Sequence, residues 1–193
     1  MSKISLSPNA SGTGTFTIAS PGTSTDRTLT LPDNSGTLLS NASTGGVSQA
    51  MLASGVAGTG PAFSAYRSGT QAITATVWTK VACQAEEFDT NSNYDNATNY
   101  RFQPTVAGYY QVSGAVEPQF GQTYQYLSFY KNGSEVKRGS VPASTATAVS
   151  LSALIYLNGS TDYVEMYVNF ASSINLNGSA AVTYFQGVLV RAA

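Results

Sequence analysis

The sequence predicts an all-β protein, built as a sandwich or barrel of antiparallel strands. Apolar and polar residues alternate with a period of two in a series of segments between residues 63 and 193. Asn-Gly pairs begin at Asn132, Asn158 and Asn177, and this dipeptide is typical of two-residue hairpin turns. The segments between these pairs lack the apolar spacing of a helix, so we expect strands joined by turns.

Each of the clearest alternating segments presents one apolar face, which we expect to form the core. In the first of them, Tyr110, Val112 and Val116 share a face, and in the next Leu127 and Phe129 do so. The predicted strands are 108–116, 123–130, 150–157, 162–170 and 182–190.

The composition agrees with β-structure and excludes several kinds of partner. Hydrophobic residues make up 42% of the 193 residues, whereas charged residues make up only 10% and the formal net charge is -1. Because Lys and Arg form no run, we expect no nucleic-acid partner. The apolar stretches are far shorter than the roughly 20 residues of a membrane-spanning helix, so we expect no membrane insertion. The N-terminus lacks a secretory signal pattern, which predicts synthesis in a cytoplasm.

The first forty residues form a separate segment with few large apolar side chains. Phe16 and Ile18 alternate with Thr, as do Leu29 and Leu31, and both runs predict short strands. So small an apolar set does not offset a backbone ordering cost of about 1–2 kcal/mol per residue. We therefore expect 1–40 to be a stem that is disordered alone or ordered by contact with other chains.

A connector and a head follow the stem. Residues 41–62 are rich in Gly, Ala and Ser, and 47–54 have the spacing of one or two helical turns. A flexible linker is the alternative for this connector. The head comprises 63–193.

Four segments of the head carry a family resemblance. FDTNSNYDNATNYRFQPTVAGYYQVSGAV at 88–116 resembles the signature of the complement-q-type globular head, one of the tumour-necrosis-factor-like jelly rolls. AFSAYRSG at 62–69, FYKNGSEV at 129–136 and FQGVLVR at 185–191 resemble the opening strand, an internal turn and the closing strand of that head. The resemblance implies a ten-stranded-type antiparallel jelly-roll sandwich that forms a homotrimer, with its chain ends together at the base. We expect four aromatic residues of these segments to fill the core: Phe88, Phe102, Tyr110 and Phe185.

The stem carries a second resemblance. GTGTFTIASP and DRTLTLPDNSGTLLS resemble segments of phage tail fibres, and the head follows no collagen-type repeat. Together the two resemblances imply a trimeric phage virion fibre, a tail fibre or short fibre. Residues 1–40 would attach to other virion proteins, and the head would contact a host surface glycan or protein. A capsid head fibre or decoration protein with a structural role is one alternative, and a secreted extracellular binding module of the same fold is the second.

Catalytic chemistry is not expected. The chain has no histidine, which removes the commonest general base and nucleophile activator, and Cys83 is expected to be a buried apolar side chain. The carboxylates are scattered, and Glu86 and Glu87 point to opposite faces of a strand. We therefore predict no enzyme and no cofactor. Asp89, Asn91, Asn93 and Asp95 would suit calcium, with a solvated turn as the alternative.

Two groups of residues are candidates for contacts with partners. Tyrosines on two strand faces, opposite the aliphatic faces, predict a trimer interface at Tyr124, Tyr126, Tyr130, Tyr163 and Tyr167, with a carbohydrate-stacking surface as the alternative. Counting strand directions back from the closing strand places the loops 117–122, 141–147 and 171–180 at the end far from the base. Their amides and one aromatic ring predict ligand binding by Gln119, Phe120, Gln122, Asn175 and Asn177.

Overall fold

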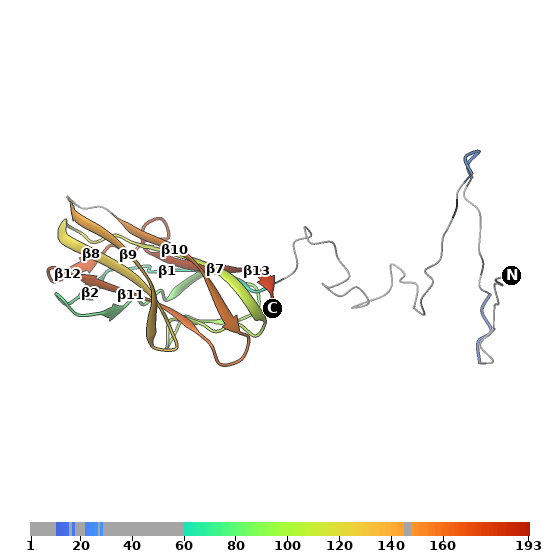
Figure 1. Cartoon of the computed structure of the whole chain (residues 1–193), viewed down its shortest axis with the longest axis horizontal. Coiled ribbons are helices and arrows are strands. Elements are labelled where there is room, and N and C mark those ends of the chain that lie inside the picture. The colour runs from blue at the N-terminus through green and yellow to red at the C-terminus, as the bar shows by residue number, and fades with distance from the viewer. Residues whose placement is uncertain (1–10, 16, 18–21, 27, 29–59, 145–147) are drawn as a thin grey trace. The chain divides into compact units, whose positions relative to one another are not determined.

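The computed structural model describes residues 11–15, 17, 22–26, 28, 60–144 and 148–193 (Figure 1). Contacts divide the chain into two units with the boundary after Ser54, and the fold described below is that of the second unit. The strands expected around Phe16 and Leu29, and the helical turns expected at 47–54, rest on residues outside the described ones.

The head contains a five-stranded sheet in which all strand pairs are antiparallel, in the order β10-β7-β13-β1-β4. Its longest ladder pairs β7 with β10, from Ala107 opposite Asn158 to Val116 opposite Val149. The strands of this sheet are β1 (Ala62–Tyr66), β4 (Ala85–Asp89), β7 (Ala107–Val116), β10 (Val149–Asn158) and β13 (Tyr184–Ala192).

A six-stranded antiparallel sheet forms the second layer, in the order β5-β6-β11-β8-β9, with β3 pairing with β11 beside this path. A two-stranded sheet pairs β12 (Ile174–Leu176) with β2 (Gln71–Ile73). The strands of the six-stranded sheet are β3 (Thr79–Lys80), β5 (Tyr94–Asp95), β6 (Arg101–Phe102), β8 (Gln122–Lys131), β9 (Ser134–Ser144) and β11 (Val164–Phe170).

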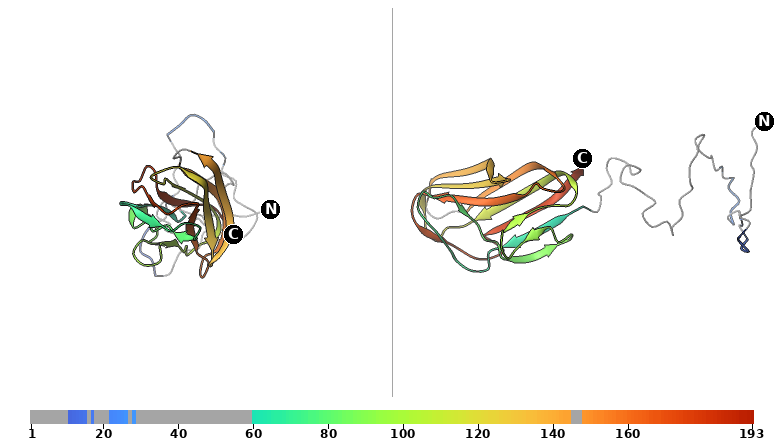
Figure 2. Two further views of the ribbon diagram at one scale, coloured as in Figure 1. Left: turned by 90° about the vertical axis from the view of Figure 1, so that its left-hand side faces the viewer. Right: turned by 90° about the horizontal axis from the view of Figure 1, so that it is seen from below.

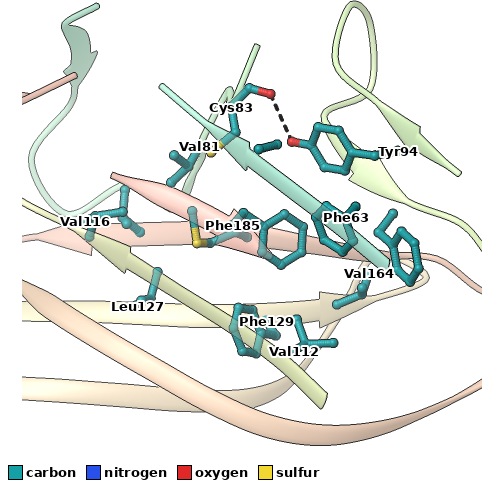
Figure 3. Close-up of a cluster of buried hydrophobic side chains, with 14 of the residues drawn as sticks. Phe63, Val81, Cys83, Tyr94, Val112, Val116, Leu127, Phe129, Val164 and Phe185 are labelled. Carbon is teal, nitrogen blue, oxygen red and sulfur yellow. Dashed lines mark hydrogen bonds between the residues drawn. The ribbon is translucent and has the colours of Figure 1, made fainter. Parts of the chain in front are cut away.

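Inward-facing side chains of both sheets form one hydrophobic core (Figure 3). Phe63 of β1 stacks on Phe102 with ring centroids 4.3 Å apart and on Tyr94 at 4.9 Å, while Phe185 meets Phe63 edge-on at 5.1 Å. Burial of each such ring contributes about 1.5–3 kcal/mol. The Tyr94 hydroxyl donates to the Cys83 carbonyl at 3.1 Å and the Tyr110 hydroxyl to the Val106 carbonyl at 2.7 Å, so both tyrosine hydroxyls of the core are satisfied.

Three of the four aromatic residues expected in the core are there, and Phe88 is not. Phe102, Tyr110 and Phe185 are buried, whereas Phe88 is 52% exposed. Phe88 pairs with Ser64 of β1, which points outward because its neighbour Phe63 points into the core. Paired residues of an antiparallel ladder lie on the same face of the sheet, so Phe88 also points outward.

Only one of the three Asn-Gly pairs forms a two-residue hairpin. Asn132 and Gly133 join β8 to β9 with φ angles of 52° and 79°, as a type I′ turn requires. Asn158 begins a wider turn, in which its side-chain oxygen accepts the N–H groups of Ser160, Thr161 and Asp162 at 2.9–3.0 Å. The third pair follows β12.

The head has its entering and leaving strands at one end (Figures 1 and 2). The Leu189 amide donates to the Pro61 carbonyl at 3.0 Å, and the Ala193 amide donates to the Ala107 carbonyl at 3.0 Å. Because β7 runs away from Ala107 and β13 runs back toward it, residues 117–121 and 171–183 lie at the opposite end. The strand directions expected from the sequence are thus confirmed for the described residues. None of those residues belongs to a helix that is long and apolar enough to cross a membrane.

Candidate binding surfaces

A groove of about 590 Å³ lies at the end of the head opposite Pro61 and Ala193, where the chain enters and leaves the head. The short ladder between β2 and β12 forms one wall, and the segment after β7 forms the other, held to β12 by a bond from the Gln119 amide to the Asn175 carbonyl at 3.0 Å. Phe120 is 71% exposed at this groove. The lining consists of Ala72, Ile73, Gln119, Phe120, Gly121, Gln122, Ser172, Ser173, Ile174 and Asn175.

Four of the five residues predicted to bind a ligand line this groove. Gln119, Phe120 and Asn175 do so at its accessible surface, whereas Gln122 is buried and its side-chain oxygen accepts the Ser172 amide at 2.8 Å. We therefore assign Gln122 to shaping the groove. Contact with a ligand stays a prediction for all of them.

Asn177 is not in the groove lining, and its amide groups hold the loop to β7. Its side-chain nitrogen donates to Glu117 Oε1 at 2.7 Å, and its backbone amide donates to the Glu117 carbonyl at 2.8 Å. Residues of β2 and the serines after β11 were missing from the predicted set. The strand directions counted back from the closing strand extend only to residue 117, so they do not reach β2. Because β2 has three residues, its alternation is too short to predict that it pairs with β12.

The five predicted interface tyrosines lie on the outward face of the six-stranded sheet, where their rings are half-buried. Tyr124 stacks on Tyr126 with centroids 4.9 Å apart, and Tyr130 meets Tyr167 at 4.3 Å. Trp78, which precedes β3, lies 6.3 Å from Tyr126 and 5.9 Å from Tyr130 and joins the two pairs. We call the rings of Trp78, Tyr124, Tyr126, Tyr130 and Tyr167 the ring row. Tyr163 lies apart from it, beneath the guanidinium of Arg101 at 4.3 Å.

An ordered network of polar side chains accompanies the ring row. Arg138 of β9 lies 5.1 Å from the Trp78 ring and 5.3 Å from the Tyr126 ring. Glu135 accepts two hydrogen bonds from Arg138, at 2.7 Å from Nε and 2.5 Å from Nη2, and a third from the Ser128 hydroxyl at 2.5 Å. The Arg138 bonds are the main reason why the pKa of Glu135 lies below its usual value. The Glu135–Arg138 pair is therefore held in place without a ligand.

The outward face of the five-stranded sheet is a second partner candidate, which we call the apolar face. Tyr109 and Tyr156 are each 43% exposed there, Leu154 is 52% exposed and Val188 is 46% exposed. Beside Tyr109 and Leu154 lies a recess of about 580 Å³, which Val190 and the C-terminal residues also line. These apolar side chains lie among uncharged Gln and Ser residues of the same face, such as Gln111 and Ser152. Isolated exposed apolar residues are normal on a surface, but a group of them on one sheet face indicates a contact with another molecule.

The Cys83 thiol is buried, and the carboxylates of Asp89 and Asp95 accept hydrogen bonds from the backbone. Burial raises the pKa of the Cys83 thiol to about 12, so it is not a thiolate near neutral pH. Asp89 accepts the amides of Asn91 and Tyr94, and Asp95 accepts those of Ala97 and Thr98. Within the described ranges, no three His, Cys, Asp or Glu side chains are grouped so as to hold a metal ion. The Asx-rich segment joins the end of β4 to β5 through bends at 90–92, and its two carboxylates accept backbone amides.

The fold of the head matches that of several solved structures. The globular domain of zebrafish complement 1qA protein aligns with a TM-score of 0.52 and 18% identity, over 69% of this chain and 99% of that one. Eiger TNF from S. frugiperda aligns with a TM-score of 0.54 and 9% identity, over 69% and 92%. The head is a jelly roll of this type. The predicted fold class is thereby confirmed.

The jelly-roll head also resembles PRD1 vertex protein P5, with a TM-score of 0.56 and 16% identity over 70% of this chain and 100% of that one. No family model matches the chain, and no curated protein does. At these identities the likeness concerns the fold alone, so function has to be argued from the surfaces of this head.

Proposed function

We propose that the chain is a trimeric virion fibre protein whose jelly-roll head carries a binding groove away from the particle. The observation that carries this proposal is that the groove and the point of chain entry lie at opposite ends of the head. The groove with Phe120 lies at the end opposite Pro61 and Ala193, where the chain enters and leaves the fold. Residues 1–40 would then attach to other virion proteins, and the groove would face outward.

The composition of the apolar face, which suits self-association, supports this proposal. The outward positions of β7 and β10 carry Tyr, Gln, Ser and Leu, and none of their side chains is charged in the described part of these strands. Depletion of charge and enrichment of Tyr distinguish the core of a protein interface from the rest of a surface. In contrast, the ring row lies among ion pairs, which include Arg138–Glu135 and Lys80–Glu165. The apolar face is for this reason the better intersubunit surface, and the ring row is its competitor.

Three copies around an axis along the head would place three grooves at one end and three entering chains at the other. Such an arrangement suits a fibre because weak binding at each groove is strengthened by simultaneous contact. The groove lining offers amide and hydroxyl groups beside the exposed Phe120 ring, and it contains no charged residue. This chemistry fits a neutral glycan or an uncharged protein patch on a host surface.

Two alternatives use the same fold and differ in location. A capsid head fibre or decoration protein would need the apolar face but not the groove. A secreted extracellular binding module would need the groove but no particle. The phage-fibre resemblance of GTGTFTIASP and DRTLTLPDNSGTLLS in the stem is the reason for preferring a virion component to a secreted module.

The test is mass spectrometry of purified particles of the virus that encodes the chain, combined with adsorption of the full chain to host cells. We expect the chain in the particle at a multiple of three copies per attachment site. We also expect Phe120→Ala to reduce adsorption and Val136→Ala, on β9, to leave it unchanged. A chain absent from the particle would contradict the virion assignment, whereas a Phe120→Ala chain that adsorbs normally would favour the decoration role.

A further inference from the structure

We propose that the groove lined by Phe120 and Gln122, which we call the distal groove, binds a neutral oligosaccharide. One sugar would stack on the Phe120 ring, and the side-chain amides of Gln119, Gln122 and Asn175 would bond to its hydroxyls. This proposal rests on the function proposed above, because it names the class of ligand for the same groove.

The Phe120 side chain gives the groove an open aromatic surface. It is 71% exposed, more than any other large apolar side chain among the described residues. At that exposure the ring is not covered by its neighbours. A sugar ring has an apolar face of C–H groups, and a flat aromatic ring covers such a face without breaking a hydrogen bond. Phe120 is therefore suited to stacking against one sugar.

Gln122 adds an unpaired N–H donor to the groove. Its side chain is 5% exposed, and its Oε1 accepts the Ser172 amide at 2.8 Å. That bond identifies the oxygen, so the other end of the side chain is the NH₂ group. Within the described residues Nε2 has no acceptor, and the side-chain atoms that are both unpaired and sealed from the surface belong to Gln125 alone. The nitrogen is therefore open to the groove, where an oxygen of a ligand would satisfy it.

Two further amide side chains are free to bond a ligand. In the part of the chain that the structure describes, Gln119 and Asn175 pair through backbone groups, and their side chains make no hydrogen bond. A side-chain amide both donates and accepts, as a hydroxyl does. Because a hexose carries a hydroxyl on most of its ring carbons, it can satisfy several of these amides at once.

Charge and size select a neutral sugar over an acidic ligand or a protein. The lining contains no charged residue, so a carboxylate or phosphate would find no cation to pair with. The volume of about 590 Å³ lies within the range of about 300–1,000 Å³ that is typical of sites for small ligands. Phe120 is the one large apolar side chain of the lining that is exposed, whereas a protein contact relies on several clustered anchors.

The walls of the groove are held in place without a ligand. The Gln119 amide donates to the Asn175 carbonyl at 3.0 Å, and the three-residue ladder joins β12 to β2. The Ala75 amide donates to Ser173 Oγ at 3.0 Å, which ties the loop after β2 to the loop after β11. A site that is already ordered loses little entropy on binding, so less affinity is lost.

The test begins with the full chain on an array of oligosaccharides built from glucose, galactose, mannose and N-acetylglucosamine. Uronic-acid and sialic-acid oligosaccharides on the same array are the acidic comparators. The neutral oligosaccharide that binds best is then titrated in free form by calorimetry, which measures a single groove because a free oligosaccharide does not bridge copies. We expect saturable binding that changes little as the NaCl concentration rises, since no ion pair contributes.

Variants locate the site. Phe120→Ala and Gln122→Glu should each weaken binding about tenfold. Gln122→Glu keeps an oxygen for the Ser172 amide and removes the N–H donor. Phe88→Ala is the matched control, because Phe88 is 52% exposed but lies on β4, outside the groove lining, and it should leave the affinity unchanged. Circular dichroism checks folding, and Asn175→Ala, which removes an exposed side chain, replaces Gln122→Glu if that variant does not fold.

Binding to acidic oligosaccharides alone, or to none on the array, would overturn the proposal. An affinity that both Phe120→Ala and the amide variant leave unchanged would overturn it too. If no sugar binds but Phe120→Ala still reduces adsorption to host cells, the groove has a protein ligand and the fibre function stands. A chain that binds a neutral sugar through these residues but is absent from purified particles would support the sugar site and contradict the fibre function.

Discussion

Tyr109 and Tyr156 lie directly opposite each other on β7 and β10, with ring centroids 5.5 Å apart, on the outward side of the five-stranded sheet. Their neighbour Leu154 is more than half exposed. Lys131 lies 5.4 Å from the Tyr156 ring, and Arg191 is opposite Tyr109, so cations border this face. Two rings and an aliphatic side chain left in water there indicate a contact with a further copy of the chain.

A charge placed on the apolar face should therefore dissociate the assembly. We expect Leu154→Asp to lower the molecular mass of the full chain from that of a trimer to that of a monomer at micromolar concentration. Burying an unpaired carboxylate is strongly unfavourable, which is the reason for the loss. Light scattering measures the mass.

The matched control for that variant is Val136→Asp, because Val136 is 41% exposed on β9 of the other sheet. It should leave the mass unchanged. If Val136→Asp dissociates the chain and Leu154→Asp does not, the six-stranded sheet with its tyrosines is the intersubunit surface. A chain that is monomeric without any substitution would contradict both assignments.

Gln125 should be replaceable with a gain in stability. Its side chain is fully buried, and neither its amide nitrogen nor its oxygen has a hydrogen-bond partner in the described residues. An unsatisfied buried polar group costs about 1–3 kcal/mol. We expect Gln125→Met, which keeps the volume, to raise the free energy of unfolding by about 1 kcal/mol in urea titrations at fixed protein concentration.

The control for the buried amide is Gln122→Met on the same strand. Gln122 accepts the Ser172 amide, so its replacement should lower stability. Equal effects of the two substitutions would show that the unpaired amide of Gln125 is not the cause.

Gly114 should not tolerate a side chain. A Cβ atom at this position of β7 would collide with Met166 Sδ from the opposite sheet and would lie 3.1 Å from the Tyr184 carbonyl. We expect Gly114→Ala to lower the thermal midpoint strongly, with a loss of about 1–3 kcal/mol from overpacking. Gly69→Ala is the comparison, because a Cβ there meets no atom within 4 Å. If neither substitution changed the thermal midpoint, the space between Gly114 and Met166 would be large enough for a methyl group, which would contradict the prediction.

Asp95 should make stability depend on pH in the acid range. Hydrogen bonds from the Thr98 amide first, and then from the Asn99 side chain, lower the pKa of Asp95 from 3.8 to about 2. A carboxyl with a depressed pKa in the folded state stabilises that state fully above pH 3.8, and this contribution is lost as the pH falls toward 2. The stability difference between the original chain and Asp95→Asn should accordingly shrink over this range in chemical unfolding experiments. A difference that stays constant from pH 5 to pH 2 would show that the turn does not perturb this carboxyl.

The alternation of residues along single strands was enough to predict much of the head. Val112 and Val116 of β7 and Leu127 of β8 are buried as expected, because a two-residue period assigns side chains to faces without knowledge of the neighbouring strands. The Asn-Gly pair predicted the two-residue hairpin at Asn132 correctly but not those at Asn158 and Asn177, so this local signal did not suffice to predict the turns.

Features that depend on pairing between distant strands were not predictable in this way. Phe88 was expected in the core, but its register opposite Ser64, next to an irregularity in the β1–β4 ladder, turns it outward. No pattern in the sequence around Trp78 predicts its position. It joins the ring row because β3, which follows it, pairs with β11 beside Tyr167. The wall of the distal groove formed by β2 likewise depends on a three-residue ladder with β12.

By itself, the sequence determined the all-β class, the faces of the long strands and the loops that lie away from the chain ends. These properties follow from short-range periodicity and from strand directions that reverse at each turn. Only the tertiary structure decided which outward faces are apolar and which carry ion pairs, and which loop residues line a groove. The reason is physical: a surface is assembled from strands that are far apart in sequence, as β1 and β13 are, and their register depends on the packing of the whole core.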